Sequence, residues 1–174
     1  MANIGSKPET KFRGDPTIFG TLVVDHDMHR HLLAQIVETT GASDDRKALF
    51  EELTFEIKGH AAAEEQALWS TVLRKPEITE DGRHAVAEHK EMDDLLNDLA
   101  ATDMASSGWL NKFHVVREEY LHHIKEEEQE LFVSVEKALT AEDKAYMDSV
   151  FQRRKAAEKD KAEVTPVKMD AAKH

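Results

Sequence analysis

The sequence predicts an all-α protein, an antiparallel up-down-up-down four-helix bundle with a two-fold internal repeat. Four long stretches carry apolar residues at the spacing of one helix face, and alternating strand-like patterns are almost absent. Glycine and proline, at 7 and 4 of 174 residues, are too few to interrupt these stretches often. We therefore expect four long helices, followed by a short C-terminal fifth helix and a charged tail.

Capping signals place the first two helices. Asp15 followed by Pro16 indicates an N-cap and a proline at the first helical position, and this helix is expected to reach about Thr39. The sequence SDD at 43–45 starts the second helix, which ends before Pro76. Short connections of this kind favour antiparallel neighbours.

The second half of the chain repeats this layout. A third helix is expected from Thr79 to about Asp103, and a fourth from the SSG at 106–108 to about Ala138. The TAED at 140–143 resembles a capping box for the short fifth helix, and the lysine- and glutamate-rich segment after it is expected to be disordered. The expected division is a flexible N-terminus, one bundle domain, and a short helix with its tail, at residues 1–14, 15–139 and 140–174.

Composition excludes several classes of protein. Asp and Glu number 35 against 23 Lys and Arg, a net charge of −12, which argues against binding nucleic acid or an anionic membrane. The absence of cysteine excludes disulfides, zinc–thiolate sites and iron–sulfur clusters. No apolar run approaches the roughly 18 residues of a membrane span, and the polar start lacks a signal-peptide core. A cytoplasmic location is therefore expected.

A repeat of 63 residues relates the two halves of the chain. HAAAEEQALW at 60–69 matches HIKEEEQELF at 123–132, and the same offset relates His26 to His89. Each half therefore has a histidine followed, 34 positions later, by H-x-x-x-E. Such a repeat indicates two copies of one two-helix unit.

The spacing within each motif places histidine and glutamate on one helix face, because residues four apart are neighbours there. These residues continue the apolar stripes and lie near the middle of their helices, so they are expected to converge in the core. His122 and Glu126 have the same spacing but continue the solvent face of Glu118, and His84 is also expected in solvent. The acidic run at 126–128 is expected to be mostly exposed, with Glu127 as its exception. The six converging residues are His26, His60, Glu64, His89, His123 and Glu127.

The chemistry of this set favours a metal centre. Two carboxylates in an apolar stripe are costly unless cations compensate them. Four imidazoles and two carboxylates suit iron, manganese or zinc, and they exceed the four ligands of one tetrahedral zinc. Two metals sharing the carboxylates and an oxo or hydroxo bridge would leave room for a small ligand. A hydrogen-bonded polar core without metal is the alternative.

Two further side chains are candidates for hydrogen bonds beside this centre. His29 lies one turn from His26, and Tyr120 lies one turn from His123. The repeat offset relates them to Met92 and Ile57, so the symmetry does not make either of them a ligand. A phenol beside a redox metal could be a ligand, a proton donor or a radical site, or simply part of the core.

The four motifs resemble those of the hemerythrin-like, HHE cation-binding family, over residues 16–138. They are DH at 25–26, HAAAEE at 60–65, EH at 88–89 and HHIKEEEQELF at 122–132. The resemblance implies a bundle that holds a non-haem di-iron centre. His26 and His60 would bind one iron, His89 and His123 would bind the other, and two carboxylates would bridge them, those of Glu64 and Glu127.

Two departures separate the chain from the marine-worm oxygen carriers of that family. Asp93 stands where those proteins have a second third-helix histidine, and Glu127 follows His123 by four residues rather than as an aspartate at five. The pattern is similar to the bacterial HHE branch, which argues against oxygen carriage on five histidines.

Three functions follow as hypotheses. The first is a di-iron protein that binds or senses oxygen, nitric oxide or peroxide, in stress or iron handling. The second is a di-iron enzyme with catalase-like activity, in which Tyr120 and His29 assist. The third is a metal-dependent module that binds a partner protein, which the acidic surface and the charged tail motivate.

Overall fold

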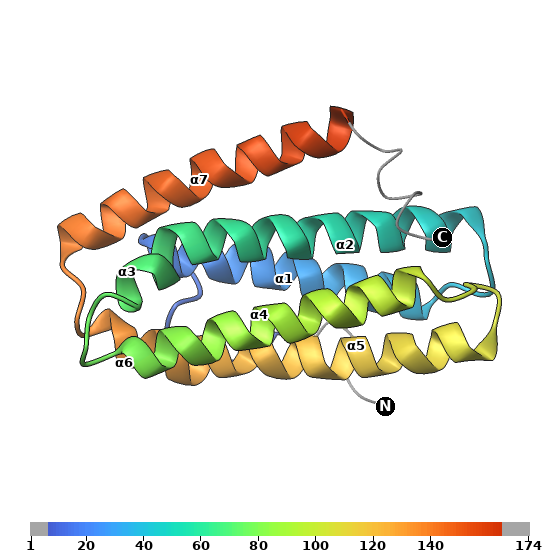
Figure 1. Cartoon of the computed structure of the whole chain (residues 1–174), viewed down its shortest axis with the longest axis horizontal. Coiled ribbons are helices and arrows are strands. Elements are labelled where there is room, and N and C mark those ends of the chain that lie inside the picture. The colour runs from blue at the N-terminus through green and yellow to red at the C-terminus, as the bar shows by residue number, and fades with distance from the viewer. Residues whose placement is uncertain (1–6, 165–174) are drawn as a thin grey trace.

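The computed structural model describes residues 7–164, which form five helical rods and no strand (Figure 1). The first four rods run antiparallel, as predicted, and the fifth lies along the second. Within these residues no helix is both long and apolar enough to cross a membrane. The elements are α1 (Ile18–Val37), α2 (Asp44–Glu64), η1 (Glu65–Trp69), α3 (Ser70–Val72), α4 (Thr79–Ala100), α5 (Ser107–Glu126), η2 (Glu127–Leu131), α6 (Phe132–Glu136) and α7 (Ala141–Val164).

Side-chain caps begin the rods close to where the sequence predicts them. Ser43 accepts a hydrogen bond from the backbone N–H of Arg46 at the start of α2, and Ser106 does the same for Trp109 at α5. The expected capping box is present at α7, where Thr140 and Asp143 exchange hydrogen bonds of 2.9 and 3.0 Å.

The start of α1 differs slightly from its prediction. Thr17, rather than Asp15, is the N-cap, and its side chain accepts from the N–H of Phe19. Asp15 in turn accepts a 2.7 Å hydrogen bond from the N–H of Thr17. The Asp15 carbonyl comes so close to Gly20 that a Cβ there would lie 1.7 Å from its oxygen. This turn therefore requires glycine.

The expected flexible N-terminus is wrong for the part that is described. Phe12 is 1% exposed and packs with Phe19 and Phe132, at ring-centroid distances of 5.0 and 6.1 Å. Arg13 reaches Asp27 of α1 at 3.0 Å, which ties the segment to the bundle. Residues 1–6 lie outside the described residues.

The fifth helix is long rather than short. It spans 24 residues, Ala141–Val164, and Figure 1 shows it in orange and red beside α2. Its first half buries Met147 and Phe151 in the core, and Lys155 then contacts Asp25 of α1. These contacts, with the strong helix propensity of its Ala, Lys and Glu residues, carry the helix through the region expected to be disordered. Residues 165–174 lie outside the described residues.

The core has two apolar clusters with a polar layer between them. One cluster includes Phe19, Trp69 and Phe132, and the other includes Leu53 and Trp109. Along each of the four bundle rods, the predicted ligand residues fall between the two clusters. The polar layer is therefore enclosed at both ends by close-packed apolar side chains.

The second and fourth rods each contain one π-helical turn at this layer. Residues 65–69 form η1 directly after Glu64, and residues 127–131 form η2 beginning at Glu127. A π-helical turn inside an α-helix changes the phase of the residues that follow, and such turns occur frequently at functional sites. Both turns occupy nearly equivalent positions in the internal repeat.

Candidate metal centre

The structure brings the six predicted residues together in two buried groups. Each group offers two imidazoles and one carboxylate whose ligand atoms all lie within 4.8 Å of one another. All six side chains are buried, with His89 the most exposed at 8%. The first group is His26 from α1 with His60 and Glu64 from α2, and the second is His89 from α4 with His123 from α5 and Glu127 from η2.

The two groups adjoin one another through the carboxylates. Nε2 of His89 lies 3.8 Å from Oε1 of Glu64 and 3.6 Å from Oε1 of Glu127, so one ring from the second group meets both acids. Nε2 of His60 lies 2.7 Å from Oε2 of Glu64, and Nε2 of His123 contacts Glu127. This placement of the glutamates between the groups is the one that bridging requires.

All four histidines are held from behind by a second carboxylate. Nδ1 of His60 lies 2.8 Å from Asp25, and Nδ1 of His26 lies 2.8 Å from Glu128. In the other half, Nδ1 of His89 lies 3.1 Å from Glu65 in a hydrogen bond, and Nδ1 of His123 lies 3.3 Å from Glu88 in an ion pair without hydrogen-bond geometry. A carboxylate on Nδ1 fixes the ring and leaves Nε2 for a metal, as in known metal–histidine–carboxylate sites.

These four carboxylates obey the same internal repeat as the ligands. Asp25 and Glu88 are 63 residues apart, as are Glu65 and Glu128, and each is the immediate neighbour of a predicted ligand. The acidic run at 126–128 was expected to expose Glu128, but that side chain is fully buried. Its carboxylate contacts His26 and Arg30 of α1, which exclude it from solvent.

Atoms at the centre lack hydrogen-bond partners among the described residues. They include Nε2 of His26 and His60, Oε2 of Glu64 and both carboxylate oxygens of Glu127. Leaving several such atoms buried without a hydrogen bond is costly, even where an oppositely charged group lies close by. Imidazole nitrogens and carboxylate oxygens are also the donors that iron, manganese and zinc accept. The residues therefore fit a pair of metal ions.

The charges of the metal-free centre are compensated within it. Burial alone would lower the pKa of His60, but the hydrogen bond with Asp25 and the negative charge of Glu64 raise it to about 9. Burial would likewise lower the pKa of His89, but the carboxylates of Glu127 and Glu65 raise it to about 9. These imidazoles are therefore cations at neutral pH when no metal is bound.

Metal uptake is expected to release protons at neutral pH and to strengthen as pH rises toward about 9. A metal needs the neutral imidazole, so His60 and His89 must lose their protons. In the metal-free chain, the folding stability that these two histidines contribute falls as pH rises, whereas metal affinity rises. Their folded pKa of about 9 lies above the ordinary 6.5, so the stability they add is full below 6.5 and is lost as pH rises through 9. Calorimetric metal titrations in buffers of different ionisation enthalpy measure the release, and heats that are independent of the buffer would contradict it.

His29 and Tyr120 form a buried pair beside the first group. Nδ1 of His29 lies 2.7 Å from the Tyr120 hydroxyl, and the His29 ring lies 5.2 Å from that of His60. Burial lowers the pKa of His29 well below its ordinary value and raises that of Tyr120 well above. Both groups are therefore neutral, and Nε2 of His29 has no hydrogen-bond partner among the described residues. The structure places this pair beside His60.

Arg30 is a buried part of the centre that sequence reasoning missed. Its guanidinium contacts both oxygens of Glu128, at 3.0 and 2.9 Å, and Asp27 at 2.8 Å. Glu128 thus receives Arg30 on one side and His26 on the other. An arginine among the polar residues of a helix gives no periodic signal that distinguishes it from a solvent-exposed one.

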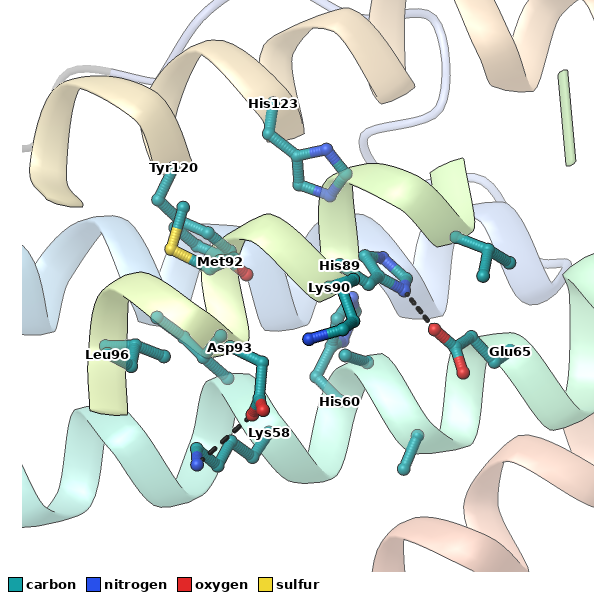
Figure 2. Close-up of a pocket in the computed structure, with 14 residues that line it drawn as sticks. Lys58, His60, Glu65, His89, Lys90, Met92, Asp93, Leu96, Tyr120 and His123 are labelled. Carbon is teal, nitrogen blue, oxygen red and sulfur yellow. Dashed lines mark hydrogen bonds and ion pairs between the residues drawn. The ribbon is translucent and has the colours of Figure 1, made fainter. Parts of the chain in front are cut away.

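A pocket leads from the surface to the centre between α2 and α4. It has a volume of about 360 Å³, and its deep wall includes His60, His89 and His123 (Figure 2). Apolar side chains such as that of Met92, the Tyr120 ring, and the charged side chains of Glu65 and Lys90 also line it. At its rim the Lys58 ammonium pairs with Asp93 at 3.1 Å. A small molecule can therefore approach the candidate ligands from this side.

Fold and site together define a helical-bundle protein with two buried His-His-Glu groups that fit a pair of metal ions. The family model described as "Hemerythrin HHE cation binding domain" matches residues 17–134, and the chain belongs to that family. A comparison with curated proteins found no match. Among solved structures, the chain is similar to the Rv2633c homolog from Mycobacterium kansasii, described as a hemerythrin HHE cation binding domain-containing protein. The TM-score is 0.80 at 23% identity, over 90% of this chain and 96% of that one, a likeness that concerns the fold.

Proposed function

We propose that the chain holds two iron ions and binds a small ligand such as oxygen, nitric oxide or peroxide, in oxidative or nitrosative stress or in iron handling. His26, His60 and Glu64 would hold one metal, and the second group would hold the other, with manganese or zinc as substitutes. The observation that carries the proposal is the carboxylate behind every histidine. Metal-binding histidines need a partner of this kind to fix the ring, whereas a hydrogen-bonded polar core does not need one behind every histidine.

The chain's own residues account for how a ligand would be received. An iron pair supplies open coordination positions and reversible electron transfer. The pocket gives a small molecule access to His60, His89 and His123. The buried Tyr120 hydroxyl can donate a hydrogen bond to a ligand when it is not bonded to His29.

Iron-supplemented growth is expected to give two irons per chain, with optical bands that change on addition of azide, peroxide or nitric oxide. His60→Ala should lose the bands, because it removes a ligand and leaves Asp25 without its imidazole partner. Metal analysis and an absorption spectrum on the same sample measure both. His31→Ala, an exposed histidine of α1, is the matched control. A chain that takes up no metal even after anaerobic loading would contradict the proposal.

A second candidate function is catalase-like dismutation of peroxide, which the neutral His29–Tyr120 pair favours. Dismutation turns two peroxides into one oxygen and two waters, so protons must move between the substrates. A buried imidazole bonded to a phenol can relay them. Tyr120→Phe should then lower the rate of oxygen release by roughly 100-fold or more without loss of metal. An oxygen electrode measures this rate.

The matched control for that prediction is Tyr146→Phe, which changes a tyrosine that is 66% exposed. Equal rates in Tyr120→Phe and Tyr146→Phe would remove the pair from the mechanism. Oxygen release that persists undiminished in His60→Ala would rule out dismutation at this centre.

A further inference from the structure

A third group of metal-binding side chains lies outside the bundle core, between α4 and α5. His84, Glu88 and Glu126 offer one ligand atom each, all within 4.8 Å of one another. Nε2 of His84 lies 2.6 Å from Oε1 of Glu88 and 2.5 Å from Oε1 of Glu126. His122 adds a second imidazole, 3.4 Å from the other oxygen of Glu126. The group combines nitrogen and oxygen ligands from two helices.

Hydrogen bonding within the protein leaves this group incomplete. One nitrogen of His84 faces two carboxylates, and only its contact with Glu126 has hydrogen-bond geometry. Oxygen Oε1 of Glu88 is therefore buried without a hydrogen-bond partner among the described residues. The other oxygen of Glu88 lies 3.3 Å from Nδ1 of His123. Glu88 thus stands between the buried centre and the outer group.

The internal repeat shows what fills the equivalent place in the first half. The counterpart of Glu88 is Asp25, which contacts Nδ1 of His60 with one oxygen and the Lys155 ammonium of α7 with the other. Lys155 also lies 3.6 Å from Glu56. The outward oxygen of the equivalent carboxylate therefore has a cation as its partner.

The side chains around that first-half position differ in kind. The counterparts of His84, His122 and Glu126 are residues without imidazole or carboxylate groups, namely Thr21, Gly59 and Ala63. Helix α7 covers that face, and a Cβ added at Gly59 would contact Glu158 at 3.6 Å. The first half, where Lys155 pairs with Asp25, thus lacks the imidazole and carboxylate side chains of the outer group. In the second half, which has them, no helix among residues 7–164 covers this face.

We propose that His84, Glu88 and Glu126 bind a divalent transition-metal ion at the surface, separate from the two buried positions. Imidazole and carboxylate ligands suit zinc and its first-row neighbours, at about 2.0–2.2 Å. Ligand atoms within 4.8 Å of one another can close around such an ion with small side-chain movements. Water or His122 can complete its shell, and the net charge of −12 favours cations near the surface.

The test compares zinc uptake by two forms of the full chain, each first loaded with iron. Equilibrium dialysis against micromolar zinc is expected to give one more bound zinc in the wild type than in His84→Ala/Glu126→Gln. The affinity for that zinc should fall at least tenfold in the double variant. His114→Ala, an exposed histidine of α5 outside the group, should bind as the wild type does.

Iron is measured in every sample, so zinc that replaces iron in the buried centre appears as lost iron rather than as a third site. Circular dichroism checks that the double variant is folded, as expected for a change centred on a side chain that is 50% exposed. Equal zinc in wild type and double variant would overturn the proposal, leaving His84 as an ion-pair partner only. The comparison counts only zinc that depends on His84 and Glu126, so it stands whether or not the buried centre prefers iron.

Discussion

Glu127→Ala is expected to abolish the binding of two metal ions. Glu127 is fully buried, contacts both histidines of its group and has neither oxygen in a hydrogen bond. Burial alone would raise its pKa, but the positive charge of His123 and the close approach of His89 lower it well below the ordinary value. The acid is thus an anion at the junction of the two groups. Removing this carboxylate should lower metal affinity by more than the roughly 10–100-fold that follows loss of an outer hydrogen-bond partner.

Metal analysis after anaerobic loading measures this effect, and Glu130→Ala is the matched control. Glu130 lies in the same π-helical turn but is exposed, so its loss should leave two metals per chain. Two tightly bound metals in Glu127→Ala would show that the carboxylate does not bridge. A single remaining metal would still support the assignment, because the first group keeps three ligands of its own.

Arg30→Met is expected to destabilise the chain by about 3–5 kcal/mol, the range for breaking a buried ion pair by removing one partner. The Arg30 side chain is 2% exposed and that of Glu128 is 0% exposed, so water cannot replace the lost contacts. Glu128 would keep His26 as its partner, and the position of that ring would be less well fixed. Urea unfolding of metal-free protein measures the free-energy change.

Arg83→Met provides the comparison, because the Arg83 side chain is 67% exposed and its ion pair with Glu80 lies in water. Its effect should stay within about 0.5 kcal/mol. Adding Glu128→Gln to Arg30→Met removes the negative charge that Arg30 no longer balances, and it should recover part of the stability. Equal losses in Arg30→Met and Arg83→Met would mean that the buried ion pair contributes no net stability.

The sequence predicted the bundle well because its four rods carry long, regular apolar stripes and clear caps. Prediction failed at both ends, where order depends on tertiary contacts. Phe12 is a lone aromatic in a polar segment, and nothing local shows that it packs between Phe19 and Phe132. The second half of α7 has few large apolar residues, and its hold on α1 is the ion pair of Lys155 with Asp25.

The six candidate ligands could be predicted because duplication displays them twice at one offset. The same offset also relates the four carboxylates behind the histidines, so they were within reach of sequence reasoning. Glu128 was assigned to solvent because a regular α-helix would turn it 100° away from Glu127. The π-helical turn removes that assumption, and no residue pattern announced it. Arg30 became recognisable only once Glu128 was placed.

The long fifth helix makes the two metal positions unequal. Duplication supplied matching ligands, but α7 covers only one half, and there a lysine ammonium backs the aspartate behind His60. Both histidines of the second group border the pocket, whereas in the first group only His60 does, because His26 lies behind Glu128 and Arg30. Two irons held here would differ in reduction potential and in speed of exchange. A mixed-valence pair would therefore have a preferred location for its extra electron.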